Sequence, residues 1–274
     1  MVALHEAVTI RKLLKIVETT LNQKNLAPVS AVKQSETETI GAVAIIPLWK
    51  RALDISMIII TSPVTVFVGA ILALIIKCGS NGPVIFKQER VGFKGSTFTC
   101  YKFRTMHLGA ETGSHRGHVE NLIKSGTTMT KLDAKNDPRV IPFGKIIRAT
   151  GLDELPQLIN VLKGEMSLVG PRPCIRYEYE VYEPWQKRRF NAVPGLTGLW
   201  QVSGKNRTTF NQMINFDIEY SERANLFLDL KIILKTVPAL MMQCYDQRVR
   251  SKQAQVTETS VNAQVGKPVG SFNA

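Results

Sequence analysis

The stretch ISMIIITSPVTVFVGAILALII, residues 55–76, decides the architecture of this chain because it contains no charged residue. As a straight helix rising about 1.5 Å per residue it would be roughly 33 Å long, enough to cross the hydrocarbon core of a bilayer. It lies too far from the N-terminus for a secretory signal, and no small-residue cleavage site follows it. One interpretation is therefore an ordinary transmembrane helix.

Two features favour a helix that enters the membrane and returns to the same side. Ser62-Pro63 lies near the middle, and proline removes a helical hydrogen bond and clashes with the preceding turn. Both flanks are basic, with Lys50 and Arg51 before the stretch and Lys77 after it, whereas a spanning helix has an asymmetric distribution of basic residues. The residues leave two topologies open: a spanning helix, and a re-entrant helix–break–helix with both ends on the cytoplasmic face.

The composition is that of a globular protein with an anionic partner. Apolar residues make up 44% of the chain and charged residues 21%. The 35 Lys and Arg exceed the 22 Asp and Glu, giving a formal charge of +13, which points to nucleic acid, a phospholipid surface or a phosphorylated substrate. The four cysteines are far apart without a CxxC pair, which excludes a disulfide scaffold and a zinc finger and suits a reducing compartment.

The charge-free stretch divides the chain into four predicted regions. They are a mobile N-terminal extension (1–46), the re-entrant membrane helix hairpin (47–78), an organised domain (79–249) and a disordered tail (250–274). Within the domain, the polar residues 107–135 are predicted to form a solvated loop. His115 and His118 in this loop have no acidic or cysteine partner at metal-ligand spacing.

The region after the membrane segment predicts a small, mostly helical α+β domain that starts with a β-hairpin. In GPVIFKQERVGFKGSTFTCYKFRTM, two β-rich runs flank a short loop containing Gly92 and Gly95. Alternation along the second run places Lys102 and Arg104 on one face. Two neighbouring cations indicate either a solvated face or a contact with phosphate.

Helices are predicted beyond the polar loop, some of them amphipathic and suited to a membrane interface. They cover an amphipathic turn at 143–148, a helix from 153 to 163 stopped by Gly164, a helix at 174–193, and an apolar helix at 226–237. The last carries Lys231 and Lys235 beside its apolar residues, which suits a bilayer surface or a core-facing helix equally. The run Gly-Pro-Arg-Pro at 170–173 predicts a rigid corner that fixes the direction of Arg172.

Asp153 and Glu154 are adjacent carboxylates at a predicted helix start. Acidic residues there can simply cap free N–H groups and offset the helix dipole. An ionised carboxylate can also attack phosphorus or hold Mg²⁺. With Lys102, Arg148 and Arg172 gathered around the pair, such a site would suit a diphosphate. The sequence has no P-loop, dinucleotide-binding or zincin motif, which disfavours those three chemistries.

Four stretches in order closely resemble the bacterial sugar transferase family, the monotopic phosphoglycosyl transferases that initiate exopolysaccharide, O-antigen and glycoprotein glycan assembly. They are KRALDISMIIITSPVTVF, QERVGFKGSTFTCYKFRTM, NDPRVIPFGKIIRATGLDELPQLINVLKGEMSLVGPRP and VPGLTGLWQVSGKN. The resemblance covers about residues 47–245. The chain looks like the small form of the family, which lacks the transmembrane helices that precede the domain in the large form.

The resemblance implies that a sugar-1-phosphate passes from a UDP-sugar to undecaprenyl phosphate. It implies that Asp153 is the nucleophile and forms a phosphosugar aspartate, that Glu154 completes the acidic pair, and that Mg²⁺ bridges the carboxylates and the diphosphate. Lys102, Arg148 and Arg172 match the family's basic positions near the phosphates.

The resemblance also implies roles for Ser62-Pro63 and for Lys205. Ser62-Pro63 matches the family's helix-breaking motif, which favours the re-entrant topology. Lys205 stands in a segment where family members often carry arginine, so it keeps the charge but loses the bidentate fork, and is a candidate for donor contact.

The implied location is the bacterial inner membrane, with the catalytic domain on the cytoplasmic face in contact with membrane lipids. Two alternatives remain: direct attack of lipid phosphate on the donor with Asp153 as a metal ligand only, and a basic membrane-tethered binding module without catalysis. No helix-turn-helix or stacking platform is recognisable, so nucleic acid is not an expected partner. Homodimerisation stays open.

Overall fold

The computed structural model describes residues 46–107, 109, 117 and 139–265. The predictions for residues 1–45, for most of the loop 107–135 with His115 and for the last residues of the tail, 266–274, lie outside the described residues. His118 lies outside them as well.

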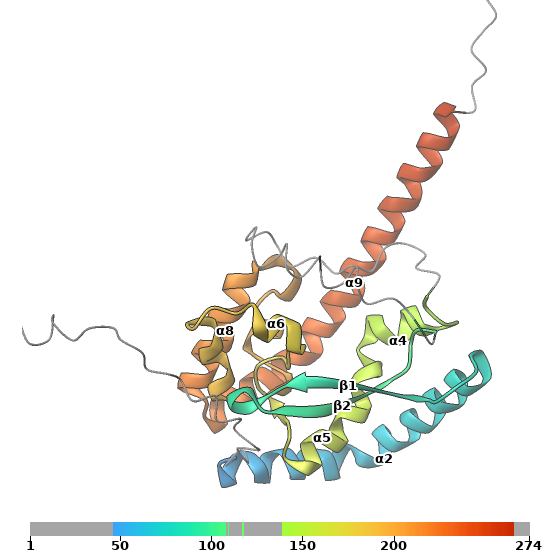
Figure 1. Cartoon of the computed structure of the whole chain (residues 1–274). Helices are drawn as coiled ribbons and strands as arrows, with labels where there is room; N and C mark the ends of the chain where they lie inside the picture. Colours follow the sequence, from blue (N-terminus) through green and yellow to red (C-terminus); the bar gives the residue numbers. More distant parts are fainter. Residues whose placement is uncertain (1–45, 108, 110–116, 118–138, 266–274) are drawn as a thin grey trace, which may run out of the picture. The chain divides into compact units, whose positions relative to one another are not determined.

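The described chain mixes helices with two two-stranded sheets, as the predicted α+β class requires (Figure 1). The α-helices are α2 (Leu48–Gly79), α4 (Gly144–Thr150), α5 (Leu158–Lys163), α6 (Arg176–Glu180), α7 (Leu199–Val202), α8 (Phe210–Arg223) and α9 (Leu226–Val265). The strands are β1 (Ile85–Val91), β2 (Thr97–Phe103), β3 (Ser167–Val169) and β4 (Gly195–Thr197), and the 3₁₀ helices are η1 (Phe93–Gly95), η2 (Leu152–Gln157), η3 (Gln186–Asn191) and η4 (Lys205–Arg207).

The apolar stretch forms one uninterrupted helix, α2, which is long and apolar enough to cross a membrane. The predicted break into two helical arms therefore differs from the structure, because Pro63 lies inside the helix. Pro63 has no N–H to donate to the carbonyl of Ile59 four residues earlier. The hydroxyl of Ser62 donates to that carbonyl instead, at 2.8 Å, so the helix tolerates the proline.

Both ends of α2 pack on the rest of the fold. Near its start the helix lies against α5, which separates it from the hairpin, and near its end it lies beside β2 and α4 (Figure 1). The buried apolar side chains of the two contacts are Ile58, Val161 and Met166, and Leu72, Ile76, Phe103, Ile141 and Ile147. On its outer face, Ile60, Val64 and Phe67 are each about two-thirds exposed.

The predicted hairpin is confirmed: β1 and β2 pair antiparallel, with Gly92 and Gly95 in the connection. Its polar face differs from the prediction at one position. Arg104 is buried, and its guanidinium donates to the carbonyl oxygens of Ser80 and Asn81 at 3.0 and 2.7 Å. Arg104 therefore ties the end of α2 to the hairpin, which leaves Lys102 as the candidate phosphate contact.

The rigid corner at residues 170–173 follows strand β3, which pairs in parallel with β4. Gly170 directly follows β3 and lies against Gly195, the first residue of β4. A Cβ atom on Gly170 would lie 2.2 Å from the carbonyl oxygen of Val193, far inside van der Waals contact. Only glycine permits this approach, which holds the corner against β4.

The helix predicted at 174–193 is two short elements, α6 and η3, with a turn between them. Pro184 explains the difference, because a proline inside a helix removes a hydrogen bond and restricts the residue before it. Around these elements Tyr182, Phe190 and Trp200 form part of a buried apolar cluster that is the largest among the described residues.

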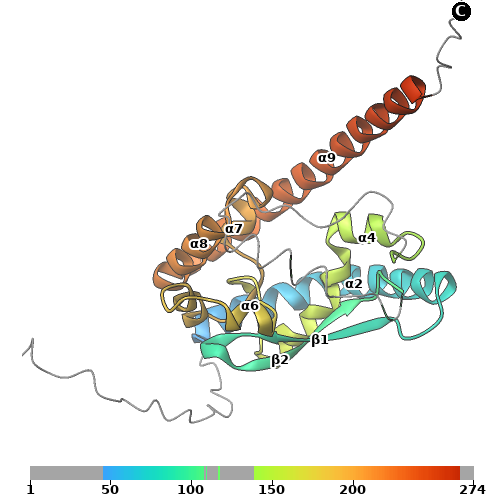
Figure 2. The same ribbon diagram turned by 45° about the horizontal axis from the view of Figure 1, so that its top comes forward.

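The C-terminal helix α9 is longer than predicted and continues beyond α7 and α8 (Figure 2). It ends at Val265, so residues 250–265 of the predicted disordered tail are helical. The reason is local: residues 250–265 contain no glycine or proline, and the next ones are Gly266 and Pro268. On its outer face, Phe227 is 82% and Leu234 75% exposed.

Candidate active site

The acidic pair lies in η2, between α4 and α5. Gly151 ends α4 in the left-handed conformation (φ 73°), and η2 follows with Asp153 and Glu154 in its first turn. The predicted helix from Asp153 to Lys163 is thus a 3₁₀ turn continued by α5, which ends at Gly164 as predicted. Strand β2 packs on η2 and carries Lys102 to the acidic pair.

Glu154 is held ionised by Lys102 and Arg172, two of the three cations predicted around the acidic pair, and by Lys205. The ammonium nitrogen of Lys102 lies 3.0 Å from Glu154 Oε1, with the two side chains 23% and 41% exposed. Loss of hydration works to raise the pKa of Glu154, but Lys102, through its charge and hydrogen bond, and the charges of Lys205 and Arg172 lower it from 4.5 to about 2. A carboxylate surrounded by three cations has the charge balance of a phosphate-binding site.

Arg172 is fixed by its surroundings. Its Nη1 lies 3.8 Å from a carboxylate oxygen of the buried Glu178, and its backbone carbonyl accepts a hydrogen bond of 2.8 Å from Arg189. Arg189 is fully buried and paired with Asp217 at 2.5 Å. The corner that presents Arg172 is therefore held by a buried guanidinium that the sequence analysis did not identify.

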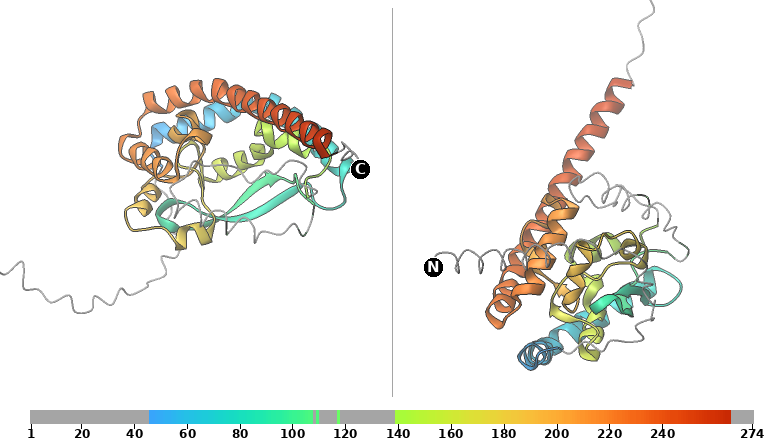
Figure 3. Two further views of the ribbon diagram at one scale, coloured as in Figure 1. Left: turned by 90° about the horizontal axis from the view of Figure 1, so that it is seen from above. Right: turned by 60° about the vertical axis from the view of Figure 1, so that its left-hand side comes forward.

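Lys205 depends on the C-terminal helix. Its backbone has a positive φ of 24°, and its ammonium group donates to Gln243 Oε1 of α9 at 2.9 Å. Figure 3 shows α4 beside α9, and the Cys244 thiol donates to the Ala149 carbonyl at 3.3 Å. Helix α9 therefore positions one cation of the site and borders the helix that precedes the acidic pair.

Asp153 and Arg148 are close to Glu154 in the chain. Asp153 directly precedes Glu154 in η2, and Arg148 lies in the last turn of α4. The structure thus brings Lys102, Arg172 and Lys205 close enough to Glu154 to lower its pKa. Asp153 and Arg148 adjoin this group through the chain.

The donor set fits Mg²⁺ shared with a substrate. Among the described residues there is no group of three or more His, Cys, Asp and Glu that would form a complete metal site. Mg²⁺, however, is commonly bound by one or two carboxylates together with substrate phosphates. Asp153 and Glu154, of which Glu154 is ionised and partly exposed, meet that requirement.

Asn160 was missed by the sequence analysis and holds η2 and α5 against the hairpin. Its buried amide donates to the Thr99 carbonyl at 2.6 Å and accepts from the Tyr101 N–H at 3.1 Å, as a neighbouring strand would. These bonds fix β2 one residue before Lys102. A polar residue within the apolar run LINVL was the available signal.

Comparison with known proteins places this chain among related sequences. The family model described as bacterial sugar transferase matches residues 46–243. The galactosyl transferase CpsE of Streptococcus agalactiae is 42% identical over 206 residues, which cover 70% of this chain and 42% of that protein. The exopolysaccharide production protein ExoY of Sinorhizobium fredii is 36% identical over 197 residues, covering 70% of this chain and 85% of that protein.

A third relative is named for its reaction. The UDP-glucose:undecaprenyl-phosphate glucose-1-phosphate transferase of Caulobacter vibrioides is 39% identical over 204 residues, covering 72% of this chain and 71% of that protein. The chain thus spans less than half of the streptococcal relative but most of the other two. Because the family model matches most of the chain, including the acidic pair and its cations, this protein belongs to the bacterial sugar transferase family.

Proposed function

We propose that this protein transfers a sugar-1-phosphate from a UDP-sugar to undecaprenyl phosphate, the first step in assembling an exopolysaccharide or related glycan. Relatives named undecaprenyl-phosphate galactose phosphotransferase and UDP-galactose-lipid carrier transferase support this assignment. The observation that carries it is the ionised Glu154, next to Asp153 and surrounded by Lys102, Arg172 and Lys205.

Transfer proceeds in two displacements at one phosphorus atom. A carboxylate oxygen of Asp153 attacks the phosphorus that bears the sugar, and the bond to the second phosphate breaks, so that UMP leaves with the electron pair. A phosphate oxygen of undecaprenyl phosphate then attacks the same phosphorus. The bond to Asp153 breaks and the carboxylate is regenerated. The product is the sugar joined to the undecaprenyl lipid through a diphosphate.

The other residues supply charge and position. Lys102, Arg172 and Lys205 offset the charge of the diphosphate and of the leaving UMP, which is the main requirement of phosphoryl transfer. Glu154 and Asp153 would hold Mg²⁺, which neutralises phosphate charge when bound. Arg148, in the last turn of α4 before the pair, adds a further positive charge five residues from Asp153 in the chain.

The two-step mechanism is tested by incubating the protein with radiolabelled donor, UDP-galactose or UDP-glucose, and Mg²⁺ without acceptor. We expect release of about one equivalent of UMP and a label that stays on the protein. Asp153→Asn should abolish both signals while keeping the folded state. Release of UMP only after undecaprenyl phosphate is added would support direct attack in a ternary complex. A protein that binds neither UDP-galactose nor UDP-glucose would support the non-catalytic module.

We also propose that α2 keeps the predicted re-entrant topology without the predicted break: it lies in one leaflet with both ends on the cytoplasmic face of the inner membrane, where the catalytic domain lies. Both ends of α2 pack on the same domain, while its outer face is apolar and exposed. A helix crossing the bilayer would separate its ends by the full hydrocarbon thickness. The exposed apolar face of α9, with Lys231 and Lys235, suits the same membrane surface.

The topology is tested by labelling single cysteines, one introduced in the N-terminal extension and one in the C-terminal tail, in spheroplasts. The re-entrant helix predicts that a membrane-impermeant maleimide reaches neither cysteine from outside and both after lysis. Labelling of one cysteine from outside would support a spanning helix instead.

A further inference from the structure

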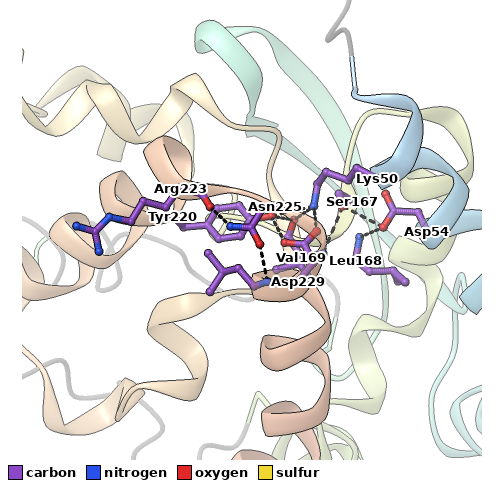
Figure 4. A network of polar contacts seen from close by, with 10 residues as sticks. Lys50, Asp54, Ser167, Leu168, Val169, Tyr220, Arg223, Asn225 and Asp229 are labelled. Atoms are coloured by element: carbon purple, nitrogen blue, oxygen red, sulfur yellow. Dashed lines mark hydrogen bonds and ion pairs between the residues drawn. The ribbon is translucent and has the colours of Figure 1, made fainter.

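Lys50, in the first turn of α2, is buried in the protein rather than free to meet lipid headgroups. Its side chain is 6% exposed, and its ammonium group donates to Asp229 Oδ2 at 2.5 Å, to Tyr220 Oη at 2.8 Å and to the Val169 carbonyl at 2.8 Å (Figure 4). These three bonds use all three protons of the ammonium group. Lys50 therefore has no proton left for a phosphate of the membrane.

Asp54, one turn further along α2, makes a second contact with the same strand. Its Oδ1 accepts hydrogen bonds of 3.0 Å from the Ser167 hydroxyl and from the Leu168 N–H (Figure 4). Lys50 and Asp54 together reach every residue of β3. Asp229, at the start of α9, draws the C-terminal helix into the same contact.

Strand β3 leads directly into the corner that presents Arg172. Only Gly170 and Pro171 separate Val169, which accepts from Lys50, from Arg172, and this corner is held tightly against β4. Arg172 in turn is one of the cations that lower the pKa of Glu154. A path of hydrogen bonds and short backbone therefore connects the base of the membrane helix with Arg172, whose charge in turn acts on Glu154.

We propose that Lys50 and Asp229 form a positioning pair that fixes the membrane helix to β3 and so sets the site of Arg172 and Glu154 at the level of the lipid phosphate. The proposal rests on the proposed function, because the acceptor is taken to be a lipid phosphate held at the membrane surface. Lys50, a basic residue before the apolar stretch, is thus an internal contact and not a lipid anchor.

The chemistry of buried ion pairs agrees with a positioning role. Such a pair adds little stability relative to well-packed apolar side chains of similar size, whereas removing one partner leaves a costly unpaired charge. Three directional bonds to one ammonium group instead define a single arrangement of α2, α9 and β3. Displacing a reacting group by about 1 Å can lower a rate by about a hundredfold.

The test uses the full-length protein in liposomes with the double variant Lys50→Met/Asp229→Leu. This variant removes both members of the pair together and keeps the hydrogen bonds of Asp54 to Ser167 and Leu168. We expect kcat/KM for undecaprenyl phosphate to fall about tenfold to a hundredfold, while KM for the UDP-sugar changes less than twofold. Partitioning onto phosphatidylglycerol vesicles should stay unchanged, because the outer face of α2 is intact. The matched control is Lys77→Met, which removes an exposed cation at the other end of α2 and should leave the kinetics unchanged.

Several results would overturn the proposal. One is unchanged kcat/KM for the lipid acceptor in the double variant, and another is an equal rise in KM for the soluble donor. Weaker vesicle binding of the double variant would identify Lys50 as a lipid anchor. If the wild-type protein turned over neither UDP-galactose nor UDP-glucose, the proposed function would fail. Amide hydrogen exchange would then test the Lys50–Asp229 pair independently of activity. In that case faster exchange at residues 167–169 of the double variant supports the pair, and unchanged exchange refutes it.

Discussion

Removing the ammonium group of Lys102 should raise the pKa of Glu154. In Lys102→Met the partner 3.0 Å from Glu154 Oε1 is lost, while the charges of Lys205 and Arg172 remain. At 3.0 Å, two unit charges interact by about 1.4 kcal/mol in water and about 5.5 kcal/mol at an effective dielectric constant of 20. Because the Glu154 side chain is 41% exposed, solvent screening favours the lower end, about one to two pKa units.

The expected pKa of Glu154 in Lys102→Met is thus between about 3 and 4, against about 2 in the wild type. Isotope-edited infrared titration with ¹³C-glutamate measures it directly, and Glu154→Gln identifies the signal. Because the wild-type pKa lies below 4.5, the ionised carboxylate stabilises the fold above about pH 4.5, and this contribution is lost as the pH falls toward 2. The contribution should be smaller in the variant.

The matched control is Lys87→Met, on the neighbouring strand β1. Lys87 is exposed and pairs with Tyr101 across the hairpin, whereas Lys102 pairs with Phe86, so the Lys87 side chain lies on the opposite face of the hairpin from Lys102. Its removal should leave the titration of Glu154 unchanged. A midpoint in Lys102→Met equal to that of the wild type would refute the idea that Lys102 keeps Glu154 ionised.

Three further changes test the fold that supports the site. Gly170→Ala should destabilise the protein by about 1–3 kcal/mol or more, because its Cβ would overlap a backbone oxygen; a thermal melt that matches the wild type would contradict this. Ser62→Ala should cost about 1 kcal/mol in detergent, and adding Pro63→Ala should recover it, because the new N–H can donate to the Ile59 carbonyl; no recovery would argue against this role of the hydroxyl. Arg189→Met should cost about 3–5 kcal/mol by leaving Asp217 unpaired, and Arg189→Met/Asp217→Leu should be more stable than the single variant in urea unfolding.

Local patterns predicted those parts of the site that depend on neighbouring residues in the chain. The hairpin, the stop at Gly164 and the corner at Arg172 each follow from turn-forming residues at fixed offsets. The prediction of a helix break at Pro63 was wrong because a neighbouring side chain compensates for the missing N–H. The Ser62 hydroxyl replaces the hydrogen bond that Pro63 removes, so the predicted break is a continuous helix.

The roles of single polar residues in the interior needed the tertiary structure. Arg104, Arg189 and Asn160 look like ordinary polar residues in the sequence, yet each makes hydrogen bonds to backbone carbonyls far along the chain. A buried polar group must find partners wherever the fold provides them, and sequence spacing does not say where that is.

By itself the sequence determined that this protein has one apolar helix, an acidic pair beside a rigid basic corner, and the motifs of a sugar transferase. Periodicity, glycine and proline act over a few residues, so these features can be read from the chain directly. Only the tertiary structure decided which cations reach Glu154 and that Lys50 lies inside the protein with Asp229. The contacts of Lys102 with Glu154 and of Lys50 with Asp229 join residues more than fifty positions apart, and their energies depend on distance and burial, which exist only after the chain has folded.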